Sequence, residues 1–223
     1  QRKLYLAAVV DAREKLRAAK PEDKMTVFAV LMRLREICCD PRLVADNWTG
    51  SSAKLDACLE LVTEAVAGGH RILLFSQFTS MLELLAKRLD EAGVSHFTLQ
   101  GSTPKPVRAE QVRRFNQGEA DVFLISLRAG GTGLNLTAAD IVIHYDPWWN
   151  LAAQNQATDR AYRIGQRNPV QVYRLIAQDT IEEKIVELQQ AKQSLADTVT
   201  GGADGAILSM NPEQLLQLLG EEA

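Results

Sequence analysis

From residue 71 onward, short apolar runs alternate with longer segments of mixed polarity, and no other feature of the sequence restricts the fold as strongly. Short runs without polar alternation are typical of strands buried on both faces. The segments between them are long enough for helices, so the alternation predicts an α/β fold in which helices cover both faces of a parallel sheet. The expected strands are Arg71–Ser76, His96–Gln100, Asp121–Leu127, Ile141–Tyr145 and Val170–Ala177.

Helical patterns occupy much of the remaining chain. Pro21 separates the first two, and Gly68-Gly69 ends the third, because glycine readily terminates a helix. The expected helices span residues 1–19, 24–39, 53–67, 79–92, 105–117, 180–198 and 212–219.

A further helix is expected to begin after Asn150, a favourable N-cap, and to end at Gly165. Small and apolar side chains recur along it at helical spacing and predict a narrow buried seam. The seam residues are Ala153, Ala157, Ala161 and Ile164.

Beside this seam, Gln156, Arg160 and Arg163 fall on one stripe of the helix. Two guanidinium groups and an amide next to a buried edge favour recognition of a planar anion. The alternative is a surface ion pair between Asp159 and Arg163, which would stabilise the helix only slightly.

Five distinctive segments follow one another in the chain, and together they resemble a known family. They are Leu34–Val44 (LREICCDPRLV), Ile72–Phe78 (ILLFSQF), Ile125–Leu136 (ISLRAGGTGLNL), His144–Asn150 (HYDPWWN) and Gln156–Arg167 (QATDRAYRIGQR). The segments are similar, in this order, to motifs of Swi/Snf-type DNA translocases in helicase superfamily two. The chain thus resembles the second, C-terminal RecA-like lobe of such a motor.

The resemblance implies three regions. Residues 1–52 would be a helical lead-in that forms part of the insertion between the two lobes. Residues 53–178 would be the C-terminal RecA-like helicase lobe, and residues 179–223 a brace helix and tail. Because the chain opens with Gln1 inside a helical pattern, we expect it to be part of a longer protein.

The sequence contains neither a Walker A motif nor an Asp-Glu-x-His segment after a strand. ATP and Mg²⁺ are therefore expected to be bound mainly by an N-terminal RecA-like lobe of the same protein, and this chain alone is expected to be inactive. The resemblance implies that Arg160 and Arg163 are catalytic and reach the γ-phosphate, with Arg163 as the main arginine finger. It also places Gln156, Gly133 and Asn135 near the nucleotide.

Small and polar residues recur where predicted strands end, which suits contact with the phosphates of double-stranded DNA. Each of these residues alone would be explained as well by an ordinary cap or a tight turn. The candidate DNA contacts are Ser76, Gln77, Gly101, Ser102, Thr103, Ser126, Arg128 and Gly130. Family resemblance further suggests that Trp149 couples the nucleotide state to DNA contact, the alternative being that Trp148 and Trp149 are core residues.

Net charge is −3, so DNA contact is expected in a local groove rather than through a general basic field. Cys38, Cys39 and Cys58 lack the spacing of a zinc site and are expected to be reduced thiols. No apolar run reaches the roughly 20 residues of a membrane span, so no membrane partner is expected. The resemblance predicts a cytoplasmic, nucleoid-associated protein if it is prokaryotic and a nuclear one if it is eukaryotic.

The sequence thus predicts the second motor lobe of an ATP-dependent double-stranded-DNA translocase or remodeller, acting on DNA and on a possible DNA-bound protein target. One alternative is a RecA-like module that binds nucleic acid or a partner without motor activity. Another is a Rossmann-type enzyme, but the chain lacks Gly-x-Gly-x-x-Gly after its first strand.

Overall fold

The computed structural model describes residues 1–127, 129, 134–149, 151–159, 161, 169–196 and 210–220. In space the chain divides into two compact units. The helical unit comprises Gln1–Lys54, Trp149–Leu151 and Ile176–Ala223. The sheet unit comprises Leu55–Trp148 and Ala152–Leu175.

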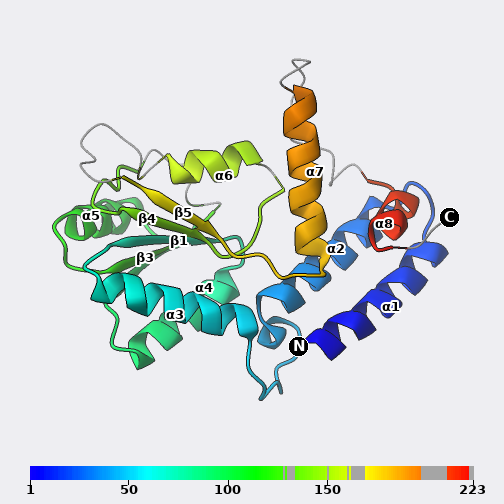
Figure 1. The fold of residues 1–223 in the computed structure, drawn as a ribbon, viewed down its shortest axis with the longest axis horizontal. Helices are drawn as coiled ribbons and strands as arrows, with labels where there is room; N and C mark the ends of the chain where they lie inside the picture. Colours follow the sequence, from blue (N-terminus) through cyan, green and yellow to red (C-terminus); the bar gives the residue numbers. More distant parts are fainter. Residues whose placement is uncertain are drawn as a thin grey trace. The chain divides into compact units, whose positions relative to one another are not determined.

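Five parallel strands form one sheet, as the strand–helix alternation predicts (Figure 1). The strands are β1 (Ile72–Ser76), β2 (His96–Leu99), β3 (Val122–Ser126), β4 (Ile141–His144) and β5 (Gln171–Arg174). Their order is β2-β3-β1-β4-β5, so the fully buried strands β1, β3 and β4 are flanked by β2 and β5. The apolar runs with the strongest strand signal therefore occupy the middle of the sheet.

Helices cover both faces of the sheet, and this prediction is confirmed (Figure 1). They are α3 (Ala53–Ala67), α4 (Thr79–Glu91), α5 (Lys105–Asn116) and α6 (Leu151–Thr158). Alternate strand residues point to opposite faces, so Leu73 and Phe75 pack with Phe115 of α5 and Ala157 of α6. On the opposite face α4 buries Met81, Leu82, Leu85 and Leu89.

The strand at β5 is shorter than Val170–Ala177 and more exposed than expected. It stands at the end of the strand order, next to β4, and Val172 is 42% exposed. Hydrophobic pattern alone does not distinguish an edge strand from a central one, because the difference arises only when strands pair.

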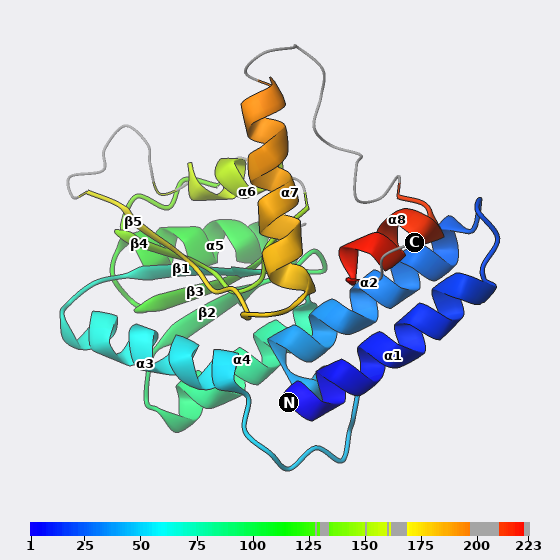
Figure 2. The same cartoon turned by 45° about the vertical axis from the view of Figure 1, so that its right-hand side comes forward.

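The helical unit contains the segments expected before and after the sheet. Its elements are α1 (Arg2–Ala18), α2 (Lys24–Cys39), the short 3₁₀ helix η1 (Pro41–Leu43), α7 (Ile181–Ala196) and α8 (Pro212–Leu218). Helices α1 and α2 lie side by side with α8 against them (Figures 1 and 2). Leu16, Leu31, Ile185 and Leu215 share one core, which explains why the first and last segments of the chain fold together.

A buried ion pair joins the start of α3 to the first turn of α7. Glu182 is fully buried and accepts a hydrogen bond from Lys54 Nζ, and the same carboxylate oxygen accepts one from Ala177 N at 2.8 Å. Burial by itself disfavours the ammonium group, but the adjacent Glu182 carboxylate outweighs this and raises the pKa of Lys54. Each buried charge therefore stabilises the other.

Glu182→Gln is expected to destabilise the chain by about 3–5 kcal/mol, because it leaves the buried Lys54 ammonium without a countercharge. Urea unfolding measures the loss. Glu187→Gln is the matched control, since Glu187 lies on the same helix in an exposed pair with Lys184. Equal, small effects of the two variants would contradict a structural role for the buried pair.

Candidate functional site

Most of the described candidate residues gather at one edge of the sheet. Parallel register aligns Ser76 with Ser126, Leu99 with Ile125, and Phe75 with His144, so these strands end together. Gln77 and the segment Gly101–Thr103 follow directly after β1 and β2. In parallel α/β sheets this carboxyl edge is where ligands bind.

Asp146 organises the centre of this edge. It is fully buried just after β4, and its carboxylate accepts hydrogen bonds from Ser76 Oγ at 2.6 Å and Gln77 N at 3.3 Å. Ser76 Oγ in turn accepts one from Phe78 N at 3.2 Å. The Ser76 hydroxyl is therefore buried and already bonded within the fold, so DNA contact through this side chain stays a prediction.

Ser126 also has a local role, whereas Gly101 and Ser102 are exposed. Ser126 is 2% exposed and accepts a hydrogen bond from Ala129 N at 3.2 Å. Thr103 Oγ1 accepts from Gln100 N and shapes the turn before α5. Helix α5 begins at this turn without a side-chain cap, leaving backbone N–H groups available at its start.

Helix α6 leaves the Gln156 side chain exposed to solvent and buries the neighbouring alanine face. Ala157 and Ala161 are 3% and 0% exposed, so this part of the predicted alanine seam is confirmed. Gln156 lies beside the seam and is exposed. Gln156, the described member of the predicted polar stripe, is thus separated from the buried seam as the helical spacing predicts.

Two polar contacts fix α6 to the sheet unit. Gln154, 1% exposed, accepts a hydrogen bond from Trp148 N at 3.1 Å. At the other end of the helix, His144 Nε2 and Thr158 Oγ1 share a hydrogen bond of 2.9 Å. Together they tie the helix that carries Gln156 to the end of β4.

The described helix ends earlier than predicted. Helix α6 stops at Thr158, and Ala161 N donates to Thr158 O in a turn, so the prediction of a continuous helix to Gly165 was wrong at Asp159 and Ala161. Local helix propensity therefore does not fix where α6 ends. Arg160 and Arg163 lie outside the described residues, as do Arg128, Gly130 and Gly133.

Asn135 is exposed but is not grouped with the strand-end residues. Its carbonyl accepts a hydrogen bond from Asn116 Nδ2 at 2.9 Å, and Asn116 Oδ1 accepts from Ala138 N. Asn116 ends α5, the helix that returns the chain to the opposite edge of the sheet. The predicted nucleotide contact of Asn135 stays a prediction.

Trp149 packs within the helical unit. Its half-buried indole ring lies 4.2 Å from the Arg35 guanidinium carbon and 6.1 Å from the Phe28 ring, both residues of α2. Trp149 is therefore partly buried against the core of the helical unit, in line with the alternative that it is a core residue. Its coupling role stays a prediction.

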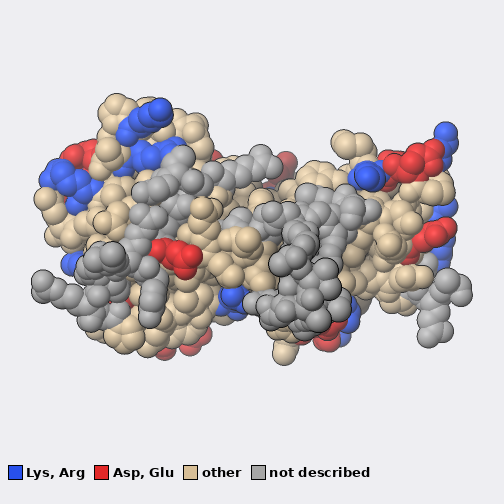
Figure 3. Space-filling view, turned by 90° about the horizontal axis from the view of Figure 1, so that it is seen from above, with Lys and Arg blue, Asp and Glu red and all other residues tan. Residues whose placement is uncertain are grey.

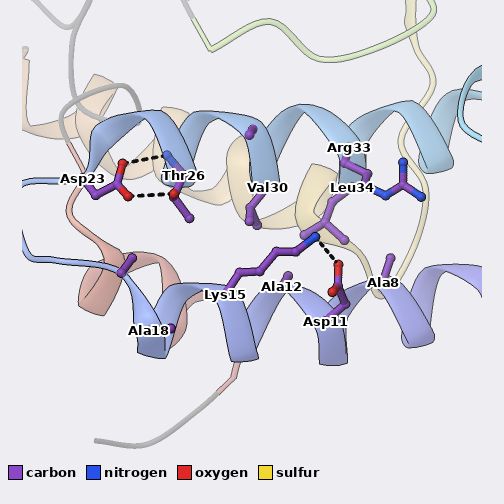
Figure 4. Close-up of a pocket in the computed structure, with 12 residues that line it drawn as sticks. Ala8, Asp11, Ala12, Lys15, Ala18, Asp23, Thr26, Val30, Arg33 and Leu34 are labelled. Atoms are coloured by element: carbon purple, nitrogen blue, oxygen red, sulfur yellow. Dashed lines mark hydrogen bonds and ion pairs between the residues drawn. The ribbon is translucent and has the colours of Figure 1, made fainter.

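The helical unit also contains a groove of about 500 Å³ between α1 and α2 (Figure 4). Alanines and Val30 form much of its lining, and Lys15, on its wall, is paired with Asp11 at 2.7 Å. Arg33 and Asp23 also line the groove, so its charged side chains are of both signs. On the face seen in Figure 3, Lys and Arg side chains form separate small groups with acidic residues nearby.

Among the described residues, no three His, Cys, Asp or Glu side chains gather closely enough to hold a metal ion. None of the helices in the described part of the chain is long and apolar enough to cross a membrane.

Sequence reasoning missed four residues that build the site: Asp146, His144, Gln154 and Thr158. Asp146 and His144 lie in the motif His144–Asn150. An acidic residue directly after a predicted buried strand could have indicated that Asp146 belongs to the site. Gln154 and Thr158 gave no such signal, because their partners depend on how α6 folds back.

Residues 53–165, about half of the chain, match the family described as helicase conserved C-terminal domain. The chain belongs to this helicase family. The putative ATP-dependent helicase/translocase YwqA of Bacillus subtilis is 40% identical to it over 201 residues, 87% of this chain and 22% of the relative. The chain spans about a fifth of the length of the curated relatives it matches.

Solved structures agree with this assignment. The SWI2/SNF2 ATPase C-terminal domain of Sulfolobus solfataricus is 27% identical to this helicase lobe, with a TM-score of 0.79 over 99% of this chain and 93% of that one. The SWI2/SNF2 ATPase core of the same organism in complex with dsDNA is 29% identical, with a TM-score of 0.79 over 99% of this chain and 47% of that one. The Swi/Snf-type, RecA-like resemblance is confirmed.

The His144 imidazole in this helicase lobe is held neutral. It is 1% exposed and stacks on Phe75 at 5.5 Å, and its burial, followed by the nearby Arg174 charge, lowers the pKa of His144 to about 3. The unfolded chain takes up this proton near pH 6.5 and the folded chain does not. The contribution of the neutral His144 to the free energy of unfolding is therefore complete above pH 6.5, and it declines as the pH falls towards 3.

The free-energy advantage of the wild type over His144→Gln is expected to be about 2 kcal/mol smaller at pH 5 than at pH 7. Urea unfolding at both pH values measures it. His70→Gln, at a half-exposed histidine whose ring pairs with Asp140, is the comparison variant. An advantage that is the same at both pH values would show that His144 also titrates normally in the folded chain.

Proposed function

We propose that this chain is the second motor lobe of an ATP-dependent double-stranded-DNA translocase or remodeller. In this proposal Arg160 and Arg163 reach ATP and Mg²⁺ that are bound mainly by an N-terminal RecA-like lobe of the same protein. The observation that carries the proposal is the anchoring of α6, which leaves Gln156 exposed to solvent and precedes the two arginines in the sequence.

ATP supplies the phosphoryl group whose transfer drives the motor, and this chain contributes only part of its site. The exposed Gln156 amide suits a phosphate or an attacking water, and we assign Gly133 and Asn135 to the same nucleotide. Arg163 would neutralise charge that develops on the γ-phosphate, with Arg160 beside it. An arginine in this position accelerates hydrolysis by roughly 10³–10⁵.

Duplex DNA is the proposed track. The carboxyl edge presents Gln77, Gly101 and Ser102 beside the uncapped start of α5, a combination suited to phosphate oxygens. A related ATPase core was solved in complex with dsDNA. We include Ser76, Thr103, Ser126, Arg128 and Gly130 in the same track.

Contacts to phosphates carry no base information, so the proposed motor would move along DNA without sequence preference. The resemblance to Swi/Snf-type translocases further implies that it would not separate the strands. Trp149 would couple ATP turnover to DNA contact. A DNA-bound protein is the proposed target, in the nucleoid-associated cytoplasm of a prokaryote or the nucleus of a eukaryote.

Arg163→Ala in the full-length protein is expected to lower DNA-stimulated ATP hydrolysis by about 10³-fold or more, because the γ-phosphate loses its countercharge. DNA binding should change little. Steady-state phosphate release and fluorescence anisotropy measure the two effects. Arg88→Ala, in an exposed pair with Glu91 on α4, is the control. Unchanged turnover would rule out the finger role.

Ser102→Glu is expected to weaken duplex binding about tenfold at low salt and equally for unrelated sequences, because it places an anion against the phosphates. Gln117→Glu introduces the same charge after the C-terminal end of α5, at the opposite edge, and should have little effect. Anisotropy titrations at several salt concentrations compare them. If both variants weaken binding equally, the edge is not the DNA track.

A further inference from the structure

The chain passes briefly through the helical unit where α6 begins, since Leu151 is the first residue of that helix. Trp148 and Ala152 belong to the sheet unit, whereas Trp149–Leu151 belong to the helical unit. Trp149 is the only aromatic residue in this three-residue segment. Whatever fixes its ring therefore fixes, through the covalent chain, the residues from which α6 begins.

The ring rests on one face of α2. Phe28 and Arg35 are seven residues apart, two helical turns, so both side chains lie on the same stripe of the helix. The Arg35 guanidinium carbon is 4.2 Å from the Trp149 ring centroid, a cation–π contact. The Phe28 ring is 6.1 Å away and tilted by 53°.

Arg35 is unusual because it is fully buried (0% exposed) in a helix whose other arginine, Arg33, is exposed. A planar guanidinium group stacks on an aromatic face in a way that an aliphatic side chain does not. Burial makes this contact stronger than at an exposed site, because no water competes for the cation. The Arg35 side chain thus supplies a rigid platform for the indole.

We infer that Arg35 is a positioning residue that acts through Trp149, and that the stacked pair sets how strongly DNA stimulates ATP hydrolysis. The inference rests on the proposed function. Arg35 itself touches neither nucleotide nor DNA in this proposal. It holds the indole ring next to the start of α6, the helix that carries Gln156 and precedes Arg160 and Arg163 in the sequence.

The test uses the full-length protein and compares ATP turnover with saturating duplex DNA and without DNA. Arg35→Met replaces the guanidinium group with a shorter, unbranched apolar side chain that suits a buried position, and so removes the planar charge. It is expected to lower the ratio of DNA-stimulated to DNA-free turnover about tenfold, since small displacements at a catalytic helix are costly. Arg33→Met makes the same change at an exposed position of α2 and should leave the ratio unaltered.

A double-mutant cycle separates positioning from general damage to the fold. If Arg35 acts through the indole, Arg35→Met will cause no further loss of stimulation in a Trp149→Leu background. Losses that multiply, or an unchanged ratio in Arg35→Met alone, would overturn the inference. A wild-type protein without DNA-stimulated hydrolysis would instead overturn the proposed function, and with it the inference.

Two measurements keep the idea testable if Arg35→Met folds poorly. Phe28→Leu, at a partly exposed position, removes the second aromatic contact and should lower stimulation about threefold in wild type but not in Trp149→Leu. In the 223-residue chain with Trp48 and Trp148 replaced by Phe, acrylamide quenching reports on Trp149 alone and should rise in Phe28→Leu. Unchanged quenching and unchanged stimulation would show that the α2 platform does not position the ring.

Discussion

Parallel pairing of the strands is the constraint on which most of the candidate site depends. Because β1, β2, β3 and β4 run in the same direction, the residues that follow them reach one edge of the sheet together. Crossover helices then have to start at that edge and return to the other. The exposed start of α5 and the exposed Ser102 therefore lie on the same side of the sheet unit as Gln77, although they are far apart in sequence.

The polar side chains at the centre of this edge are buried and hydrogen-bonded within the fold. Asp146 is fully buried, and its carboxylate is tolerated because Ser76 and the backbone of Gln77 donate to it. The side chains of His144 and Gln154 are also buried. Each has its hydrogen-bond partner only when α6 is packed against the end of β4. A helix held by such contacts presents Gln156 in a defined position, as catalytic groups require.

Buried charge recurs in the helical unit, where it joins segments that are distant along the chain. Glu182 and Lys54 lie 128 residues apart in sequence and share one buried hydrogen bond. Arg35 stacks on Trp149, which the chain reaches only after completing β4. Both contacts therefore form only when the chain has folded, because their partners are distant in sequence.

The sequence by itself determined the class of fold, most helix and strand boundaries, the family, and the separation of Gln156 from the alanine seam. These features follow from local periodicity, from turn residues and from motifs that are contiguous in the chain. The order of the strands, the exposure of β5, the end of α6 at Thr158, the burial of Ser76 beneath Asp146 and the seating of Trp149 on Arg35 were decided only by the tertiary structure. Each of these depends on groups that are remote in sequence and meet only when the chain packs, and local periodicity carries no information about which distant group will be the neighbour.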